Sequence, residues 1–459
     1  MAGRRGYGWL AAVAGVTAAG GAIRFATLSV QSFWLDEAVT HRLVTSPLGA
    51  MLRAIPHSES TPPLYYVLAW AWARVFGTGE AGLRSLSALF GTATIVLVAL
   101  VARRLAGDRA AVAAAALAAA NPLLIWYSQE ARAYALLVAL CAVTVWCLVR
   151  RDWIGWAIAA ALALATHYFA VFIVVPELAW ALSQRELRPK AARAALAPAA
   201  AAVALLPLAI TQAGGSRAAF IGSTSLASRV AAVPKQLLIG YASPGAAELT
   251  ALAAVLAVVL AVGLRRRDAD LAGLALAAVG VPVALAVLGA DYLITRNVIA
   301  AMVPLVVLGA VASTRLRAGP LIVAGICAAG VVAFVGVELT PSDQRADWRA
   351  VAAQVGSLAV PRAVVLEPAS GAPAFEIYAP MVPLPGIAAR TVSEIDVVEL
   401  GSAAPRVVTP VPFPGFAVSW LRVDGFVFIR YVASAPTVVN FGQLVTLAPA
   451  QHPQVLVNR

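Results

Sequence analysis

The sequence predicts a polytopic α-helical membrane protein of about eleven spans, with its N-terminus inside, its C-terminus outside and a small extracytoplasmic α/β domain at its end. Three observations support this fold class. Of 459 residues, 61% are hydrophobic and 12% are charged, and the mean hydropathy is +0.84, which excludes a water-soluble surface. Apolar stretches of about 20 residues follow one another through the first 340 positions, which excludes a single span or a lone signal peptide. Beyond them, apolar runs shorten and prolines multiply.

The charge of the chain is strongly positive, with 34 lysines and arginines against 22 acids and a formal net charge of +12. The arginines cluster at the ends of apolar segments, and no basic stretch has interleaved aromatic residues that would stack on bases. We therefore expect a lipid bilayer as partner and no nucleic acid. The three cysteines lie inside apolar segments, which favours packing over a disulfide or a metal site; they are Cys141, Cys147 and Cys327.

The cationic clusters set the predicted orientation, because they occur at alternate turns of the chain. They lie at residues 4–5, 103–109, 150–151, 185–193, 265–267 and 315–317. The positive-inside rule places these turns, and the N-terminus, in the cytoplasm. The remaining loops then face outward, and these are residues 31–80, 129–132, 166–168, 212–248 and 291–296.

Two stretches need this orientation to be interpreted. Residues 62–77, within a first outer loop of residues 29–81, would reach only about 24 Å as a helix, and counting them as a span would put the cluster at 103–109 outside. We expect an amphipathic helix in the outer interface, where its tyrosines and tryptophans are common. Residues 153–184 have cationic clusters at both ends, which requires an even number of crossings. A short hairpin turning at 166–168 satisfies that requirement.

The chain then divides into a catalytic transmembrane domain, 1–340, and an extracytoplasmic α/β domain, 341–459. The predicted spans are 9–28, 82–102, 109–126, 132–149, 153–166, 169–183, 194–212, 247–264, 271–290, 297–314 and 319–338. In the second domain we predict a helix at 347–358 and strands at 363–366, 407–411 and 425–431. The predicted location is the plasma membrane, with the active site and the second domain outside.

Ionisable residues are nearly absent from the middle of the predicted spans, with Glu177 as the main exception. A proton- or ion-coupled transporter is expected to place carboxylates near the bilayer midplane. Here the acids and bases collect at the outer ends of the spans. This distribution favours an enzyme that acts at the outer face on a lipid-anchored substrate.

The outer loops contain the candidate catalytic residues. Asp36 and Glu37 follow Phe33-Trp34-Leu35 just after the first span, and we interpret them as catalytic acids; the alternative is two solvated loop acids. Glu59 precedes the interfacial helix, where it either meets substrate or complements the helix dipole as a first-turn acid. Glu130 and Arg132 are two residues apart and so do not share a helix face, which implies that each has a partner elsewhere or a ligand.

Histidine and arginine at the other outer turns complete the candidate set. His167 and Tyr168 occupy the tip of the short hairpin, where the histidine is either a turn residue or a ligand. With Asp36, Glu59 and other histidines it could form a divalent metal site, but the spacing has no known metal signature. Arg296 caps the outer end of the tenth predicted span, and either extends toward the interface or binds phosphate.

Four segments follow one another in a characteristic order and spacing, and they are Trp-Leu-Asp-Glu at 34–37, Thr-Pro-Pro-Leu-Tyr-Tyr at 61–66, Leu-Arg-Ser-Leu-Ser-Ala-Leu-Phe-Gly at 83–91 and Tyr-Ser-Gln-Glu-Ala-Arg at 127–132. In these segments the sequence resembles the GT-C superfamily of membrane glycosyltransferases, in the branch of protein O-mannosyltransferases and lipid A aminoarabinose transferases. The resemblance covers the first 190 residues well and residues 292–304 moderately.

The resemblance implies a polyprenyl-phosphate-linked sugar donor used at the outer face, with an acid of the first outer loop as base. That role falls to Asp36, with Glu37 beside it. The aminoarabinose transferases have a lysine just before the Pro-Pro pair, where this chain has Thr61, so Arg84, Arg132 or Arg296 must supply the cation for the donor phosphate. The remaining residues expected to contact substrate are Glu59, Glu130, His167, Tyr168, Tyr65 and Tyr292.

The chemistry is consistent with the resemblance. Attack by an acceptor hydroxyl on the anomeric carbon needs a carboxylate to take the proton. The phosphate leaving group needs only cations, from arginines or a bound divalent ion. One base and one cationic clamp predict single displacement with inversion, onto a glycan, lipid or protein acceptor. The alternatives are a transporter or flippase for lipid-linked sugars, a scaffold for the outer domain, and an oligosaccharide ligase with a pyrophosphate-linked donor.

Overall fold

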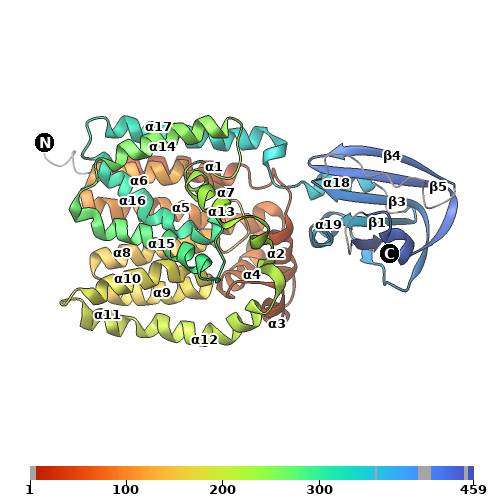
Figure 1. The fold of residues 1–459 in the computed structure, drawn as a ribbon, viewed down its shortest axis with the longest axis horizontal. Helices are drawn as coiled ribbons and strands as arrows, with labels where there is room; N and C mark the ends of the chain where they lie inside the picture. The colour runs from red at the N-terminus through yellow and green to blue at the C-terminus, as the bar shows by residue number, and fades with distance from the viewer. Residues whose placement is uncertain (1–6, 357–358, 402–414, 449–452, 459) are drawn as a thin grey trace. The chain divides into compact units, whose positions relative to one another are not determined.

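The computed structural model describes residues 7–356, 359–401, 415–448 and 453–458, without the side chains of residues 216–219. The chain forms two compact units (Figure 1). We call Met1–Leu28 with Leu43–Leu339 the helical unit, and Ser29–Arg42 with Thr340–Arg459 the sheet unit. The units differ from the predicted domains in one respect, because a segment of the first outer loop groups with the C-terminal part of the chain.

The helical unit contains a helix in each of the eleven ranges that the sequence predicts as spans. These helices are α1 (Gly8–Ala26), α5 (Glu80–Ala106), α6 (Asp108–Ala120), α7 (Pro122–Ser128), α8 (Tyr134–Arg150), α9 (Trp153–Thr166), α10 (Val171–Ser183), α12 (Leu196–Ala213), α14 (Ala246–Ala261), α15 (Ala269–Val287), α16 (Met302–Ser313) and α17 (Gly319–Leu339). Among the described residues, six helices are long and apolar enough to cross a membrane, or seven if α6 and α7 form one broken span. Apolar helices of 10–17 residues occupy the other four ranges. The number of crossings therefore stays a prediction.

The break between α6 and α7 differs from the single span predicted at 109–126. The two helices meet at an angle of 63°. Asn121 precedes Pro122, and a residue before proline disfavours the helical conformation; its φ of −71° and ψ of 121° are extended. Its side chain accepts a hydrogen bond from Leu124 N at 2.9 Å, which begins the new helix. The bend redirects the chain toward the corner at residues 127–132.

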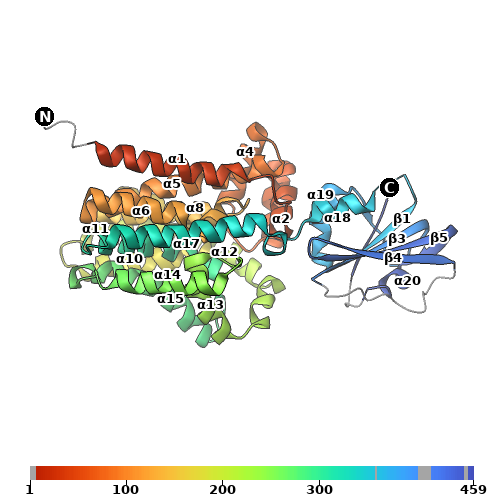
Figure 2. The ribbon, with the colours of Figure 1, turned by 90° about the horizontal axis from the view of Figure 1, so that it is seen from above.

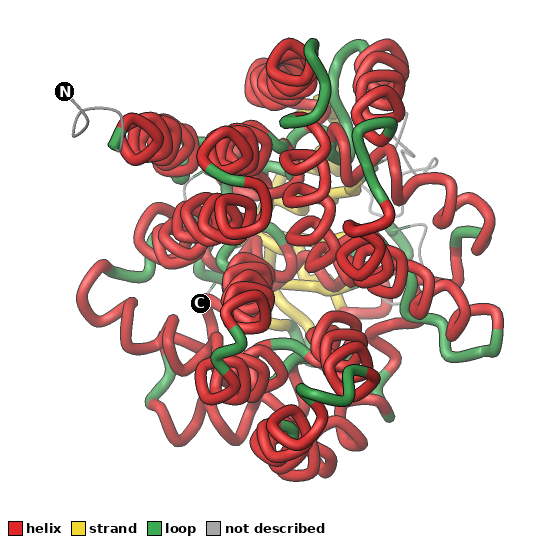
Figure 3. The backbone as a smooth tube through the Cα atoms, turned by 90° about the vertical axis from the view of Figure 1, so that its left-hand side faces the viewer, coloured by secondary structure: helices red, strands yellow, loops and turns green. Residues whose placement is uncertain are grey.

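Small side chains let the helices of this unit approach one another closely. Helix α5 contacts α1, α6, α8 and α16, and Figure 3 shows the helices end on. The buried side of α6 is formed by alanines, which are Ala110, Ala111, Ala114, Ala115 and Ala118. Such surfaces permit close packing where no water is present to drive association. In Figure 1, α14 and α17 lie along one edge of the unit and α12 along the opposite edge.

The loop of residues 29–81 is more helical than the sequence predicts. The predicted helix at 62–77 is present as α4 (Leu64–Phe76), and two further helices precede it, α2 (Leu35–Thr45) and α3 (Leu48–Ser58). Helix α3 is short and amphipathic, and it buries Met51 and Ile55, one turn apart. The remaining helices are η1 (Tyr168–Ala170), α11 (Arg188–Ala194), η2 (Ser216–Ser223), α13 (Leu226–Ile239), η3 (Arg266–Asp268) and η4 (Thr295–Ala301).

The sheet unit is built on a six-stranded sheet in the order β2-β6-β1-β3-β5-β4. Its strands are β1 (Arg362–Glu367), β2 (Val382–Pro383), β3 (Ala389–Leu400), β4 (Phe416–Val423), β5 (Phe426–Asn440) and β6 (Gln454–Val457). Strands β1 and β3 are parallel, and the other described pairs are antiparallel. The predicted strands at 363–366 and 425–431 correspond to β1 and β5, whereas the one at 407–411 lies outside the described residues.

Helices cover both faces of this sheet (Figure 2). They are α18 (Trp348–Val355) and α19 (Ala372–Tyr378) on one face and α20 (Phe441–Val445) on the other, with the short turns η5 (Pro341–Asp343) and η6 (Ala369–Gly371). Alternate residues of β1 pack on opposite sides. Val364 and Leu366 join the core with Trp348 of α18, while Val365 joins the core with Leu444 of α20.

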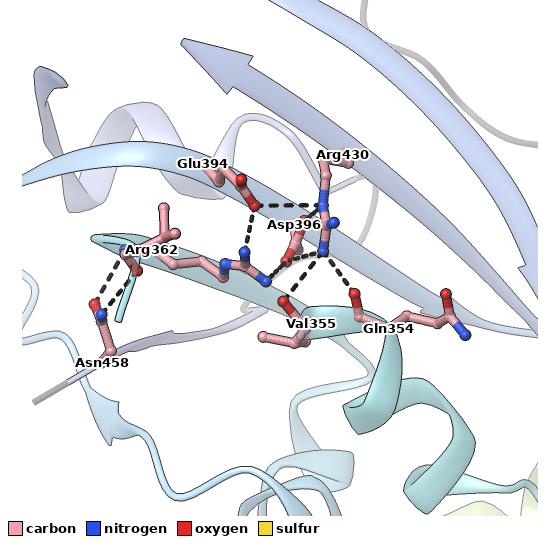
Figure 4. A network of polar contacts seen from close by, with 8 residues as sticks. Gln354, Val355, Arg362, Glu394, Asp396, Arg430 and Asn458 are labelled. Atoms are coloured by element: carbon pink, nitrogen blue, oxygen red, sulfur yellow. Dashed lines mark hydrogen bonds and ion pairs between the residues drawn. The ribbon is translucent and has the colours of Figure 1, made fainter. Parts of the chain in front are cut away.

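A charged network fixes α18 on the sheet (Figure 4). Asp396, fully buried, accepts hydrogen bonds from Arg362 Nη1 at 3.1 Å and from Arg430 Nε at 2.8 Å, and Glu394 pairs with both arginines. Arg430 Nη2 also donates to Gln354 O at 2.7 Å, in the last turn of α18. A cation at this position satisfies a carbonyl that the helix leaves open.

Candidate functional site

A buried ion pair joins two of the residues that the sequence singles out. Arg132, between α7 and α8, donates from Nη1 and Nη2 to Glu59 Oε1 and Oε2, at 2.8 and 2.9 Å. Their side chains are 9% and 3% exposed. Glu59 follows the last residue of α3 as its C-cap and lies before α4, so the helix-dipole alternative does not apply to it. The bidentate geometry holds the guanidinium in one orientation.

Hydroxyl groups surround this ion pair. The Arg132 guanidinium carbon lies 5.8 Å from the centre of the Tyr66 ring, and the Tyr66 hydroxyl is 2.9 Å from Thr61 Oγ1. Burial raises the pKa of Tyr66 well above its usual value, so it stays a neutral phenol. The Tyr65 hydroxyl lies 3.2 Å from Ser87 Oγ. These contacts join α4 to α5 beside the ion pair.

His167 ends α9 in the same neighbourhood. Its Nδ1 accepts a hydrogen bond from Phe169 N at 3.2 Å, and its ring lies 5.4 Å from the ring of Tyr134. Burial, followed by the charges of Arg132 and Arg296, lowers the pKa of His167 to about 3. Both arginines therefore act on one imidazole. His167 is neutral at pH 7, and because Nδ1 is an acceptor, Nε2 bears the hydrogen.

We expect His167 to remain neutral at pH 5, well below the ordinary histidine pKa of 6.5. Histidine NMR of ¹³C-labelled protein, with His167→Gln to assign the signal among the four histidines, measures this directly. The folded pKa is depressed, so the unfolded state binds the proton more readily and stability falls as pH drops from about 6.5 towards 3. Titration of the His167 signal near 6.5 would contradict this environment.

Arg296 is the second residue of η4 and, with Glu59, Arg132 and His167, forms what we call the cluster around Arg132. Its guanidinium carbon lies 5.5 Å from the centre of the Phe220 ring. The Tyr241 hydroxyl is hydrogen-bonded to the Tyr127 hydroxyl. Burial raises the pKa of Tyr241, and among the nearby charges Arg296 lowers this pKa and Glu130 raises it. Arg296 and the fully buried Glu130 thus lie close enough to influence the same phenol. Tyr292, 44% exposed, contacts the ring of Phe169 at 5.9 Å.

Tyr168 and Arg84 have mainly structural contacts. The Tyr168 hydroxyl donates to Gln212 Oε1 at 2.8 Å, and Gln212 Nε2 donates to Thr61 O at 3.2 Å, which ties the hairpin to α12 and the start of α4. Burial raises the pKa of Tyr168 to about 12. Arg84 is 1% exposed and donates to Leu28 O at 2.7 Å, at the end of α1. A phosphate-binding role for Arg84 stays a prediction.

Asp36 and Glu37 lie in the sheet unit, in the first turn of α2. They are therefore helical residues where the sequence suggested loop acids. Glu37 is fully buried, with Oε2 3.5 Å from Trp34 N, while Asp36 is partly exposed. The open N–H groups of a first helical turn stabilise carboxylates.

The C-terminal part of the sheet unit holds the segment that contains these acids. Ser32 Oγ accepts a hydrogen bond from Trp348 N at 3.0 Å, and Phe33 N donates to the Tyr378 hydroxyl at 2.8 Å. Ala38 packs in the same core as Trp348. Sequence reasoning missed these partners because more than 300 positions separate them from the segment.

Sequence reasoning also missed Arg24, a fully buried arginine in α1. It donates to Ala118 O at 2.9 Å, to Ala119 O at 3.1 Å and to Ser128 Oγ at 3.1 Å. The signal was available, since Arg24 is the one charged residue in the apolar stretch 9–28. For a metal ion, the part of the chain that the structure describes holds no group of three or more His, Cys, Asp or Glu side chains.

The fold defines a class of protein, a helical protein whose described residues include helices long and apolar enough to cross a membrane, followed by a C-terminal β-sheet domain. Residues 60–211 match the family model for dolichyl-phosphate-mannose-protein mannosyltransferase. This range contains Glu130, Arg132, His167 and Tyr168, and it begins one residue after Glu59. No curated protein matches the sequence.

Two solved structures share the fold over nearly the whole chain. ArnT from Cupriavidus metallidurans in the apo state is 14% identical, covers 97% of this chain and 99% of its own, and has a TM-score of 0.59. The same protein bound to undecaprenyl phosphate is 15% identical, covers 94% of this chain and 100% of its own, and has a TM-score of 0.58. The resemblance to GT-C enzymes predicted from the sequence is thus confirmed.

Proposed function

We propose that this protein is a membrane glycosyltransferase that moves a sugar from a polyprenyl-phosphate-linked donor to a cell-envelope or protein acceptor at the outer membrane face. The observation that supports this function best is that Arg132 and Arg296 both lie close enough to the buried, neutral imidazole of His167 to lower its pKa. It occurs in a fold whose solved relative ArnT has been seen with undecaprenyl phosphate. Two arginines beside a neutral imidazole suit an anionic headgroup.

In this proposal, Asp36 takes the proton of the acceptor hydroxyl as the hydroxyl oxygen bonds to the anomeric carbon. The bond from that carbon to the phosphate oxygen breaks on the opposite side, which inverts the anomeric configuration. Arg296 stabilises the negative charge left on the polyprenyl phosphate. Arg132, held in one orientation by its bidentate contact with Glu59, is proposed to face the donor phosphate together with Arg296.

The sheet unit is proposed to position the base. Residues 29–42 join the helical unit at both ends, through Leu28 and Leu43, and inside the sheet unit they are held by Trp348 and Tyr378. Truncation after Glu338 should therefore leave donor binding measurable while transfer falls, because the segment that contains Asp36 loses these partners. Loss of donor binding in a truncated chain that still folds would contradict this division.

Tyr378→Phe offers a finer test of that positioning. It removes one hydrogen bond to Phe33 N, which contributes about 0.5 to 1.5 kcal/mol, so we expect kcat to fall about 2- to 10-fold with donor KM unchanged. Tyr7→Phe is the matched control, since Tyr7 is 71% exposed in the other unit. A rise in donor KM with constant kcat would place Tyr378 in donor binding instead.

The proposed function is tested by incubating the purified protein in lipid nanodiscs with a panel of polyprenyl-phosphate sugars. Mass spectrometry identifies the donor that is consumed, and NMR of the product gives its anomeric configuration. Consumption with inversion supports the proposal. Movement of a lipid-linked sugar across vesicles without transfer would favour the flippase alternative, and retention of configuration would overturn the single-displacement mechanism.

A further inference from the structure

The helical unit contains a cavity that shares no lining residue with the cluster around Arg132. It has a volume of about 880 Å³ and is formed by the starts of α1, α6 and α17 and by the loop between α16 and α17. Helix α5 separates the two places, because Ser87 near its start contacts Arg132 O and its last residue, Ala106, precedes the cavity wall at Asp108. Some twenty residues of helix correspond to about 30 Å.

The floor of the cavity is apolar. Helix α6 contacts both α1 and α17, and the side it presents between them has Val112, Ala113 and Ala116. Ala12 and Ala324 line the flanks. Small side chains between two flanking helices leave a trough, and neighbouring aliphatic groups make it suitable for a hydrocarbon chain.

The rim of the cavity is cationic. Arg109 and Arg317 line it and are exposed, and no described residue accepts a hydrogen bond from either. The acidic charge nearby is already paired, since Asp108 lies 2.9 Å from Arg103 Nε, and Arg315 donates from Nη2 to Asp268 at 2.9 Å. Two positive charges at the mouth therefore remain available for an anion.

Besides the apolar floor and the cationic rim, the cavity has an aromatic residue, Trp9, in its lining. Its indole lies in the lining, with the Arg103 guanidinium carbon 4.0 Å from the ring centre. Tryptophan and arginine together are typical of the headgroup level of a bilayer. The sequence predicts this end of the helices to be cytoplasmic, where anionic lipids provide the negative charge.

We propose that this cavity binds one anionic phospholipid, with the phosphate at Arg109 and Arg317 and an acyl chain along α6. A free anion would make no use of the apolar floor, and a neutral lipid would make none of the cationic rim. The site is independent of the proposed transfer reaction, since none of its residues belongs to the cluster around Arg132. The negative charge of the headgroup and the acyl chain together identify the occupant as an anionic phospholipid.

The full-length protein, stripped of lipid in detergent, is titrated with phosphatidylglycerol and followed by native mass spectrometry. Arg109→Gln with Arg317→Gln should weaken the retention of phosphatidylglycerol about 25-fold, since each arginine contributes a factor of about 5 near an anionic lipid. Ala113→Phe should weaken it by filling the floor. Arg104→Gln, an exposed arginine outside the lining, is the matched control and should retain the wild-type value.

Further ligands distinguish the headgroup from the chain. Phosphatidylcholine and inorganic phosphate should each bind more weakly than phosphatidylglycerol. The binding of inorganic phosphate should be the same in the wild type and in Ala113→Phe. Equal retention of phosphatidylglycerol by the wild type and the double arginine variant overturns the proposal. So does equal retention of phosphatidylcholine and phosphatidylglycerol, or displacement of bound phosphatidylglycerol by millimolar phosphate, provided that each variant elutes as the folded protein by size exclusion.

Discussion

Replacing Asp36 with asparagine is expected to lower the turnover of sugar transfer by about 10² to 10⁴ while the protein still folds. Asparagine has nearly the same shape as aspartate but cannot accept the acceptor's proton at neutral pH. Because Asp36 is partly exposed in the first turn of α2, the substitution costs little packing. Turnover with the donor found in the panel, measured on the purified variant, gives the factor.

The controls for this prediction separate chemistry from folding. Asp424→Asn changes an exposed acid of the same sheet unit and should leave turnover unchanged. Donor binding should also be preserved in Asp36→Asn, because the proposed role concerns the acceptor. Wild-type turnover in Asp36→Asn would remove this residue from the mechanism, and the neighbouring Glu37 would become the carboxylate to test.

The second large effect is expected at the ion pair of Glu59 and Arg132. Glu59→Gln leaves a buried guanidinium without its counter-charge, which should destabilise the fold by about 3 to 5 kcal/mol. Thermal unfolding in detergent measures the change. The double variant Glu59→Gln with Arg132→Gln should recover part of this lost stability, because neither charge of the pair is then buried without the other. Donor use should stay impaired in the double variant. A double-mutant cycle yields the coupling free energy.

A matched pair on the surface shows whether burial is the cause. Arg103 and Asp108 are 45% and 53% exposed, so Asp108→Asn should change stability by less than about 1 kcal/mol. If Glu59→Gln has an equally small effect, the ion pair does not hold Arg132. If Arg132→Gln and Arg296→Gln both keep the wild-type donor dependence, the phosphate binds elsewhere, and Lys235, whose Nζ donates to Tyr241 O at 2.6 Å, is the next candidate.

Much of the fold follows from local patterns in the sequence. Apolar stretches of near-constant length predict helices because an α-helix satisfies its own backbone hydrogen bonds, and a helix lies in every predicted range. The break at Asn121 was missed although Asn-Pro is a local signal, because the apolar composition continues across it. In the sheet unit, β1 and β5 were predicted from short apolar runs, whereas their pairing order was not.

The candidate site also has a part that the sequence predicts and a part that it does not. The residue types at the turns predicted to be outer, the resemblance to GT-C enzymes and the candidates Asp36, Arg132, His167 and Arg296 could all be read from the sequence. Their partners could be found only in the folded structure. Glu59 pairs with Arg132 across 73 positions, and the segment that contains Asp36 is held by Tyr378, whose hydroxyl bonds to a residue 345 positions away. Such contacts have no local signal, because hydrogen bonds and ion pairs depend on distances in space that the packing of helices and strands creates.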